Sequence, residues 1–354
     1  MPSDDRTDAS ERRPRLTPPI ADARRAVRAV LEPVDPDETG ATPPLALVAL
    51  SGGADSLALA AATAFEAPRA GWRAGAVVVD HGLQAGSAAV AERAAAQARE
   101  LGLDPVLVRR VEVPAAGQGP EASARAARYA ALDAVAAETG AAIVLLGHTL
   151  DDQAETVLLG LARGAGGASL MGMPQRAGRY VRPLLGLRRE TTRQACLDAG
   201  LDVWDDPHNT DPGYARVRVR ERVLPVLEAE LGPGIAEALA RTAEQLREDE
   251  AAFDEQLEEF IEEICEPAEA GIAVSAAVLA ANPAALRQRI IRHVVGSEFG
   301  VALSRVQTLE VARLVTDWHG QGPVALPGGA VATRAGAHVV FSATGATEIL
   351  PHDH

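Results

Sequence analysis

The residues with the clearest chemical potential form the stretch S-G-G-A-D-S, which runs from Ser51 to Ser56 and follows the apolar run LALVAL. We expect the apolar run to be a buried strand and residues 54–66 to be a helix. A tight glycine-rich turn between a strand and a helix leaves the first N–H groups of the helix unpaired at the positive end of its dipole. The pattern therefore predicts an anion cradle that suits phosphate, and the plainer alternative is a helix cap with Asp55 in the first turn.

The members of this loop suit different parts of a nucleotide site. Gly52 and Gly53 let an oxyanion approach the backbone closely, and Asp55 can hold the Mg²⁺ that accompanies a polyphosphate. The two flanking serines add hydroxyl donors. We therefore expect the nucleotide to contact Ser51, Gly52, Gly53, Ala54, Asp55 and Ser56.

A second apolar run, AVVVD at residues 76–80, ends in Asp80 and is followed by His81. If the two runs are parallel neighbours, their carboxyl ends meet at the edge where open α/β sheets bind ligands. Both polar residues are therefore candidates to contact the nucleotide. The structural alternative is a turn-forming aspartate beside a half-exposed histidine.

Residues 121–138 have helical spacing, which places Glu121, Arg125 and Arg128 on one helix face. An exposed ion pair is the simpler explanation, and such a pair contributes only about 0.3–0.5 kcal/mol. The functional alternative is an arginine pair and a carboxylate that bind a zwitterionic substrate.

The stretch G-H-T-L-D-D-Q-A-E-T at residues 147–156 follows another strand-like run, AAIVLLG. Thr149 and Asp152 have the spacing of a capping box, so a purely structural explanation exists. Three carboxylates and a histidine are more than a cap requires. Asp152 and Glu155 share a helix face and His148 lies just before it, which predicts a catalytic pair and a substrate-binding histidine at the ligand edge of the sheet.

A glycine-rich segment at residues 161–173 begins near Arg163, and it is either a loop that closes over a nucleotide or a flexible connection. After it comes the one dense basic run of an acidic chain, which is a candidate phosphate-contacting surface, although part of it suits ion pairing with neighbouring aspartates. Its members are Arg176, Arg179, Arg182, Arg188, Arg189, Arg193, Arg216, Arg218, Arg220 and Arg222. Among them we expect Arg182, Arg216 and Arg220 to contact substrate.

The composition excludes several classes of protein. All 34 positive side chains are arginines, so neither a Walker A lysine nor a Schiff-base lysine is present. The net charge of −15 argues against a general nucleic-acid coat but leaves room for a local arginine patch. The distant Cys196 and Cys265 fit neither a disulfide framework nor a zinc ribbon, and no stretch suits a membrane span or a signal peptide, so we expect a cytoplasmic protein.

The order of elements predicts a two-domain α/β protein. Strand-like runs at 45–50, 76–80, 105–113 and 141–147 alternate with helical segments at 54–66, 87–101, 121–138 and 150–162, which is typical of a doubly wound parallel sheet. We expect a flexible arm at 1–42 containing one short helix, a catalytic domain at 43–222, and a mainly helical domain at 223–354 with short strands near its end.

These motifs, in this order, resemble the tRNA(Ile)-lysidine synthetase family of the PP-loop N-type ATP pyrophosphatases. The resemblance rests on SGGADS, VDHGLQ, E-x-x-x-R-x-x-R-Y, GHTLDDQAET, RGAGGASLMGM, RPLL and DDPHNTDPGYARVRVR, between about residues 45 and 225. Thr149 stands where the family often has a second histidine, and Val217 where an asparagine usually follows the arginine.

The resemblance implies a ligase that uses ATP to join L-lysine to carbon 2 of the wobble cytidine of a CAU-anticodon tRNA(Ile), through an adenylated cytidine. Loop 51–56 would hold pyrophosphate, Asp55 and Asp152 would bind Mg²⁺, and Arg163 would neutralise the phosphates. Glu155 or Asp152 would act as base towards lysine. Recognition of the lysine ends would fall to Glu121, Arg125 and Arg128, and tRNA binding to the C-terminal domain.

Three competing functions stay open at this level. A tRNA thiolase of the same superfamily normally needs paired cysteines, and an ammonia-dependent ligase needs neither the basic run nor the extra helical domain. A nucleotide-binding signalling module needs no catalysis. The oligomeric state, including a homodimer, is likewise open.

Overall fold

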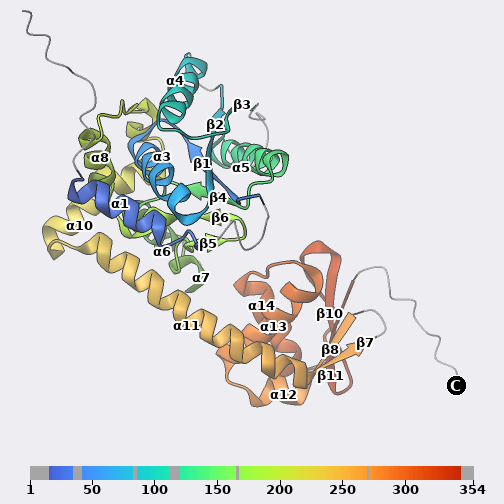
Figure 1. The fold of residues 1–354 in the computed structure, drawn as a ribbon. Helices are drawn as coiled ribbons and strands as arrows, with labels where there is room; N and C mark the ends of the chain where they lie inside the picture. Colours follow the sequence, from blue (N-terminus) through green and yellow to red (C-terminus); the bar gives the residue numbers. More distant parts are fainter. Residues whose placement is uncertain are drawn as a thin grey trace, which may run out of the picture. The chain divides into compact units, whose positions relative to one another are not determined.

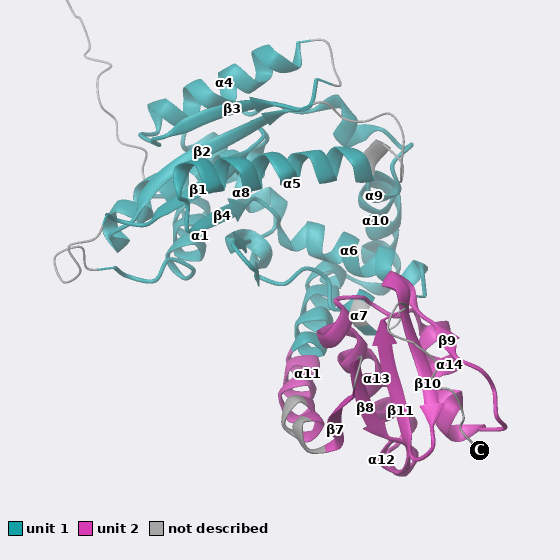
Figure 2. Ribbon diagram, turned by 90° about the vertical axis from the view of Figure 1, so that its right-hand side faces the viewer, with its two compact units in different colours: residues 1–247 teal, residues 248–354 magenta. Residues whose placement is uncertain are grey.

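The computed structural model describes residues 16–34, 42–82, 86–111, 120–164, 167–268 and 271–343. The chain divides into two compact units, residues 1–247 and 248–354, with the division inside helix α11 (Ile235–Ile264) (Figure 2). The boundary expected at residues 222 and 223 stays a prediction.

The first unit contains a six-stranded sheet in the order β3-β2-β1-β4-β6-β5. Its strands are β1 (Leu45–Leu50), β2 (Arg73–Asp80), β3 (Val106–Arg110), β4 (Ile143–Leu146), β5 (Arg176–Ala177) and β6 (Tyr180–Val181). All pairings are parallel except that of β5 with β6. The chain moves outward from β1 through β2 to β3 and then returns to the other side of β1 at β4, so the strand order reverses there (Figure 1).

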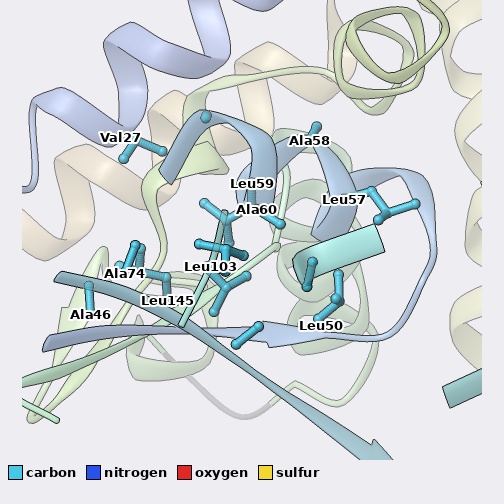
Figure 3. Close-up of a cluster of buried hydrophobic side chains, with 14 of the residues drawn as sticks. Val27, Ala46, Leu50, Leu57, Ala58, Leu59, Ala60, Ala74, Leu103 and Leu145 are labelled. Atoms are coloured by element: carbon cyan, nitrogen blue, oxygen red, sulfur yellow. The ribbon is translucent and has the colours of Figure 1, made fainter. Parts of the chain in front are cut away.

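Helices cover both faces of this sheet, as the predicted doubly wound fold requires. The helices are α3 (Ala54–Glu66), α4 (Ser87–Glu100), α5 (Pro120–Thr139), α6 (Leu150–Ala162) and α8 (Arg189–Asp198). Alternate residues of β1 face opposite ways, because side chains of a strand point to alternating sides. Ala46, Val48 and Leu50 pack in one core with α3, α4 and α8 (Figure 3), whereas Leu45 and Leu47 pack with α5.

The expectation of a flexible arm is wrong for the part of it that forms α1 (Pro18–Arg28). Ile20, Ala23 and Val27 repeat at helical spacing and are buried in the core with α3 and α8. Arg28 also binds the buried Glu66 through two hydrogen bonds of 2.8 Å. The short helix expected within the arm is therefore part of the core, and residues 1–15 and 35–41 lie outside the described residues.

Short elements join the longer helices and strands of the first unit. They are the 3-10 turns η1 (Ala67–Ala70), η2 (Pro183–Gly186) and η3 (Pro207–Thr210), the helices α7 (Gly167–Leu170), α9 (Ala215–Arg218) and α10 (Leu224–Leu231), and the π-helical turn η4 (Val219–Val223). The turn η4 interrupts the regular helix between α9 and α10, and such turns often occur at functional sites.

The second unit combines helices with an antiparallel sheet in the order β7-β8-β11-β10-β9. Its helices are α12 (Ala276–Ala281), α13 (Ala284–Phe299) and α14 (Arg305–Thr316), and its strands are β7 (Cys265–Ala268), β8 (Gly271–Ser275), β9 (Val324–Ala325), β10 (Ala330–Ala335) and β11 (His338–Ala343); a 3-10 turn, η5 (Pro327–Gly329), precedes β10. The expected terminal strands are confirmed. Strands β7 and β8 were not expected, because five or fewer residues are too few for periodicity to separate strand from helix.

Candidate active site

A cavity of about 580 Å³ opens at the carboxyl ends of β1, β2 and β4. Because β1 lies where the strand order reverses, this is the switch point at which open α/β sheets bind ligands. Ten of the expected site residues line the cavity: Ser51, Gly53, Ala54, Asp55, Ser56, Asp80, His81, Arg128, His148 and Arg220.

Loop 51–56 is held in shape by its two serine hydroxyls. The Ser56 hydroxyl donates to the Gly53 carbonyl at 2.9 Å and accepts from the Ser51 amide at 3.1 Å. Among the described residues, no side chain caps α3 at Gly53. The first N–H groups of α3 therefore lack both a cap and an acceptor within the helix, which favours the anion cradle over the alternative of a capped helix.

The glycines around this loop serve different purposes. Gly52 has a φ of +86°, which side-chain-bearing residues rarely adopt. Gly53 has an ordinary φ of −75°, and a Cβ there would meet no atom closer than 3.6 Å. The fold thus leaves room at Gly53 that a ligand can use. At Gly147 a Cβ would lie 3.1 Å from the backbone of Asp55 and Ser56, so this glycine lets the end of β4 approach α3.

Three carboxylates form a cluster in which one guanidinium contacts all of them. Arg189 lies 2.8 Å from Asp152, 3.3 Å from Glu155 and 3.6 Å from Asp55. Asp55 and Asp152 belong to the first turns of α3 and α6, and Arg189 is the first residue of α8. The N-termini of three helices therefore converge at this carboxylate cluster.

Two more arginines contact the cluster through Glu155, whose side chain has no exposed surface. Arg220 binds both carboxylate oxygens of Glu155, at 2.7 and 3.0 Å. Arg216 lies 3.8 Å from Glu155 and donates to the Thr156 hydroxyl at 3.3 Å. A buried carboxylate without such partners would be strongly destabilising, so these arginines offset the cost of burying Glu155.

Burial and charge act differently on the two aspartates of the cluster. Burial raises the pKa of Asp55 to about 6, against the opposing effects of the Thr192 hydroxyl and Arg189. Burial also acts on Asp152, but Arg189 and the Thr149 amide, which donates to Asp152 at 2.9 Å, hold its pKa below the usual range. The expected capping geometry is thus present, and the carboxylate that forms it also binds Arg189.

Two neutral imidazoles line the cavity. Burial lowers the pKa of His148 to about 4 and also lowers the pKa of His81. In each ring Nδ1 is buried without a hydrogen-bond partner among the described residues. Both rings are therefore uncharged near neutral pH, and each has one ring nitrogen without a partner among the described residues.

Asp80 makes the turn-forming contact considered for it and also lines the cavity. Its Oδ1 accepts from the Gly82 amide at 3.0 Å, which is the turn-forming contact of the structural alternative. The Ser87 hydroxyl outweighs burial and, with that amide, holds the pKa of Asp80 below its usual range. Asp80 also lines the cavity as an ionised group.

The other expected site residues lie outside the described lining of the cavity, and they include Gly52, Asp152, Glu155 and Arg216. Arg163 is exposed at the C-cap of α6, and Arg125 is exposed and donates to the Tyr129 hydroxyl at 3.2 Å. Arg182 is buried and donates to the Pro174 carbonyl at 2.9 Å. The Glu121 side chain lies outside the described residues.

Arg189 and Thr192 are site residues that the sequence motifs did not single out. Thr192 is fully buried and its hydroxyl donates to Asp55, while Arg189 joins all three carboxylates. Arg189 was within the basic run, but the run alone did not separate it from its neighbours. The available signal was the charge of three clustered carboxylates, which demands a buried cation nearby.

The oxygen donors of Asp55 and Asp152 suit Mg²⁺, which prefers carboxylates together with phosphates and water. No group of three or more His, Cys, Asp or Glu side chains in the described part of the chain is arranged to hold a metal ion by itself. Both aspartates contact Arg189. A magnesium ion would therefore compete with this guanidinium for the same oxygens.

Two family models match the chain. One, described as a PP-loop domain, matches residues 23–227, and the other, described as a TilS substrate binding domain, matches residues 275–338. The first match contains the cavity-lining residues and spans more than half of the chain.

Several curated proteins named tRNA(Ile)-lysidine synthase are similar over most of their length. The protein from Leifsonia xyli subsp. xyli (strain CTCB07) is 66% identical over 82% of this chain and 88% of its own. The protein from Streptomyces coelicolor (strain ATCC BAA-471 / A3(2) / M145) is 54% identical over 85% of this chain and 86% of its own. The protein from Thermobifida fusca (strain YX) is 51% identical over 92% of this chain and 98% of its own.

A solved structure shares the fold. It is the U34-tRNA thiolase NcsA from Methanococcus maripaludis with its 4Fe-4S cluster, with a TM-score of 0.51 over 65% of this chain and 80% of that chain. At 21% identity the likeness concerns the fold alone. Among the residues that the structure describes, no helix combines the length and apolar character that crossing a membrane requires.

The raised pKa of Asp55 predicts a gain in stability when its charge is removed. Its pKa in the folded state is about 6, against an ordinary 3.8, so the folded protein binds more protons between these values and loses stability as the pH rises through them. Asp55→Asn cannot titrate. At about pH 8 it should raise the free energy of unfolding, by up to about 3 kcal/mol, and it should flatten the decline between about pH 4 and 6.

Urea unfolding followed by Trp72 and Trp204 fluorescence, in a Trp318→Phe background, measures this in the first unit. Asp22→Asn is the matched control, because Asp22 forms a surface pair with Arg25 at 3.1 Å and its loss should change stability by less than about 0.5 kcal/mol. A lower stability of Asp55→Asn than of the wild type at about pH 8 would contradict the prediction.

The free space at Gly53 predicts a selective loss of ATP binding in Gly53→Ala. The added methyl should keep the free energy of unfolding within about 1 kcal/mol, because it meets no atom of the protein closer than 3.6 Å. It should weaken ATP binding by roughly 10- to 100-fold, since overpacking against a ligand costs about 1–3 kcal/mol. Equilibrium titration with ATP measures the effect, and Gly322→Ala, also at an open position, is the control. Equal ATP affinity in both variants would show that no ligand uses the space at Gly53.

Proposed function

The chain belongs to the tRNA(Ile)-lysidine synthase family, and we propose that the cavity beside loop 51–56 is where it carries out both steps of the family reaction. The activity of the family is ATP-dependent formation of lysidine on tRNA(Ile), which makes the chain a ligase. The observation that carries the proposal is that Asp55 lines the cavity at the uncapped start of α3 and also belongs to the carboxylate cluster, which it shares with Asp152 and Glu155 through Arg189.

In the first step, the oxygen on carbon 2 of the wobble cytidine attacks the α-phosphate of ATP, and pyrophosphate leaves. In the second step, the ε-amine of lysine attacks carbon 2, AMP leaves with the oxygen, and the amine gives up a proton. The product joins lysine to the CAU anticodon through a carbon–nitrogen bond and changes decoding from AUG to AUA.

Loop 51–56 would bind the pyrophosphate part of ATP. Its first-turn N–H groups lack a cap, and phosphate at a helix N-terminus gains from both the N–H donors and the dipole. Asp80 and His81, at the end of β2, line the same cavity and would contact the rest of the nucleotide. The role of Arg163 on the phosphates needs a movement of its exposed side chain towards them.

Magnesium is expected with ATP, held by Asp55 and Asp152. Bound there, the ion would supply positive charge to the leaving pyrophosphate. The chain's own contribution is to offer the two carboxylates, each of which contacts Arg189 in the structure.

Lysine needs a base because its ε-amine attacks only when neutral. With a pKa near 10.4, deprotonation at pH 7 costs about 4.6 kcal/mol, at 1.36 kcal/mol for each pH unit. Glu155 and Asp152 are the candidates to accept this proton, since carboxylates act as general bases when they lie within reach of the reacting group. Arg125, Arg128 and His148 lie near enough to interact electrostatically with one another, and with Glu121 they would bind the ends of the amino acid.

For the tRNA, we propose contacts from the C-terminal domain, residues 223–354, which includes the matched substrate binding domain. Arg216 and Arg220 would contact the substrate while they hold Glu155. Arg182, which donates to the Pro174 carbonyl in the structure, is expected to contact the substrate as well. A cytoplasmic location suits this substrate, and a homodimer stays an expectation.

The competing functions fit less well. A thiolase would need paired reactive cysteines, whereas Cys196 and Cys265 lie in different units and burial raises the pKa of the Cys196 thiol to about 12. An ammonia-dependent ligase leaves the substrate binding domain unexplained. A signalling module does not explain the buried carboxylate cluster, because the desolvation cost of buried ion pairs often exceeds the stability that they contribute.

The test is mass spectrometry of CAU-anticodon tRNA(Ile) after incubation with ATP and labelled lysine, together with measurement of pyrophosphate release. We expect lysine to be joined to the tRNA, and pyrophosphate to be released only when tRNA is present. In Glu155→Gln, pyrophosphate release should persist while lysine transfer in a single turnover falls by about 100-fold or more, because the base is absent.

Glu138→Gln is the matched control, since Glu138 is an exposed carboxylate bound to Arg109 at 2.5 Å and should leave both steps unchanged. Absence of lysine from the tRNA would refute the proposed function. Unchanged lysine transfer in Glu155→Gln would refute only the role of Glu155.

A further inference from the structure

Arg189 occupies a position that is unfavourable for a cation unless it has strong partners. It is the first residue of α8, where the positive end of the helix dipole repels a guanidinium. Burial also disfavours its charge, yet Asp152, Glu155 and Asp55 together hold its pKa above the usual range. Arg189 is therefore held in place by the carboxylates and not by its own helix.

The cluster as a whole is neutral in the ligand-free protein. Three carboxylates, of Asp55, Asp152 and Glu155, contact three guanidiniums, of Arg189, Arg216 and Arg220. An incoming ammonium group would find no uncompensated negative charge there and would meet like charges at close range. Lysine can use these carboxylates only if one guanidinium withdraws.

Of the three arginines, Arg189 is best placed to withdraw. Arg220 is fixed on Glu155 by two contacts of 2.7 and 3.0 Å, and Arg216 makes its contacts outside the described lining of the cavity. Arg189 lines the cavity and spreads its contacts over separate carboxylates at 2.8, 3.3 and 3.6 Å. Its longest contact is to Asp55, within the loop where phosphate would bind.

We propose that Arg189 is an internal cation that occupies the carboxylate cluster until ATP binds. The phosphates at loop 51–56 attract the guanidinium, which pairs well with phosphate oxygens, and Glu155, which is not among the expected magnesium ligands, then becomes available to the lysine ε-ammonium. Lysine therefore binds after ATP, and the two substrates bind with positive coupling. This inference rests on the proposed function and adds the order of binding and the residue that enforces it.

The experiment measures lysine binding calorimetrically with and without a non-hydrolysable α,β-methylene analogue of ATP. In the wild type, the analogue should tighten lysine binding by at least about 10-fold, and lysine should tighten analogue binding by the same factor, because coupling between two sites is reciprocal. In Arg189→Gln, lysine should bind equally with and without the analogue, and the analogue itself should bind more weakly.

Arg188→Gln is the matched control. Arg188 is the neighbouring arginine, pairs with Asp151 at 3.2 Å and Glu237 at 3.0 Å, and lies outside the described cavity lining. Its variant should keep the wild-type coupling. Arg189→Lys keeps the positive charge without the planar guanidinium, so it should retain weaker coupling than the wild type. It is the second variant to measure if Arg189→Gln does not fold.

Three outcomes of these binding measurements would count against the proposals. Equal lysine affinity in the free and analogue-bound wild type would overturn the proposal. Coupling of wild-type size in Arg189→Gln or Arg189→Lys would also overturn it, because a purely structural arginine lowers affinities without removing the coupling. Failure of the wild type to bind the analogue at all would instead count against the proposed function of loop 51–56.

Discussion

The structure of the site depends on ion pairs between charged side chains in the first turns of three helices. The starts of α3, α6 and α8 converge at the carboxyl ends of the central strands, and each brings the positive end of its dipole. The start of α3 has no cap, whereas α6 has a capping box and the Arg189 amide of α8 donates to Asp151 at 2.7 Å. The carboxylates of Asp55 and Asp152, in two of these turns, compensate that positive potential. Arg189, in the third turn, pairs with both carboxylates and compensates their negative charge. The close approach of β4 to α3 at Gly147 brings these turns together. The arrangement leaves the start of α3 open to an anion.

Such a cluster is a poor way to stabilise a fold. Taking ions out of water costs several kcal/mol for each, and well-packed apolar side chains usually do as well or better. Glu155 is nevertheless fully buried among arginines, and burial raises the pKa of Asp55 despite a hydroxyl donor and a guanidinium. Charges retained at such a cost are typical of functional sites. Here they lie beside the cavity where a nucleotide and an amine would meet.

Much of the first unit is predictable from sequence, because its signals are long and repeated. The bounds of β1, α3 and α6 match the expected residues, since uninterrupted apolar strands and amphipathic helices leave little ambiguity. The segment now seen as α1 reads as loose because its three buried residues lie between charged ones, and only its contact with α3 and α8 explains their burial. Strands β7 and β8 are too short for their periodicity to distinguish a strand from a helix.

The candidate site also has a part that the sequence predicts and a part that it does not. Loop 51–56 and the polar ends of β2 and β4 are visible in the sequence because each follows its strand directly. Arg189 is not, because its importance lies in contacts with residues 34, 37 and 134 positions away. Arg220 was expected to contact substrate, but its pairing with Glu155, 65 positions away, was not expected. Local sequence thus specifies the phosphate cradle, and only the tertiary structure specifies which cations complete it.

The most direct measurement is a crystal structure of the protein with the α,β-methylene analogue of ATP. The account predicts phosphate oxygens within about 3 Å of the first-turn amides of α3, at hydrogen-bonding distance. Phosphates bound elsewhere, with those amides turned to other acceptors, would contradict it.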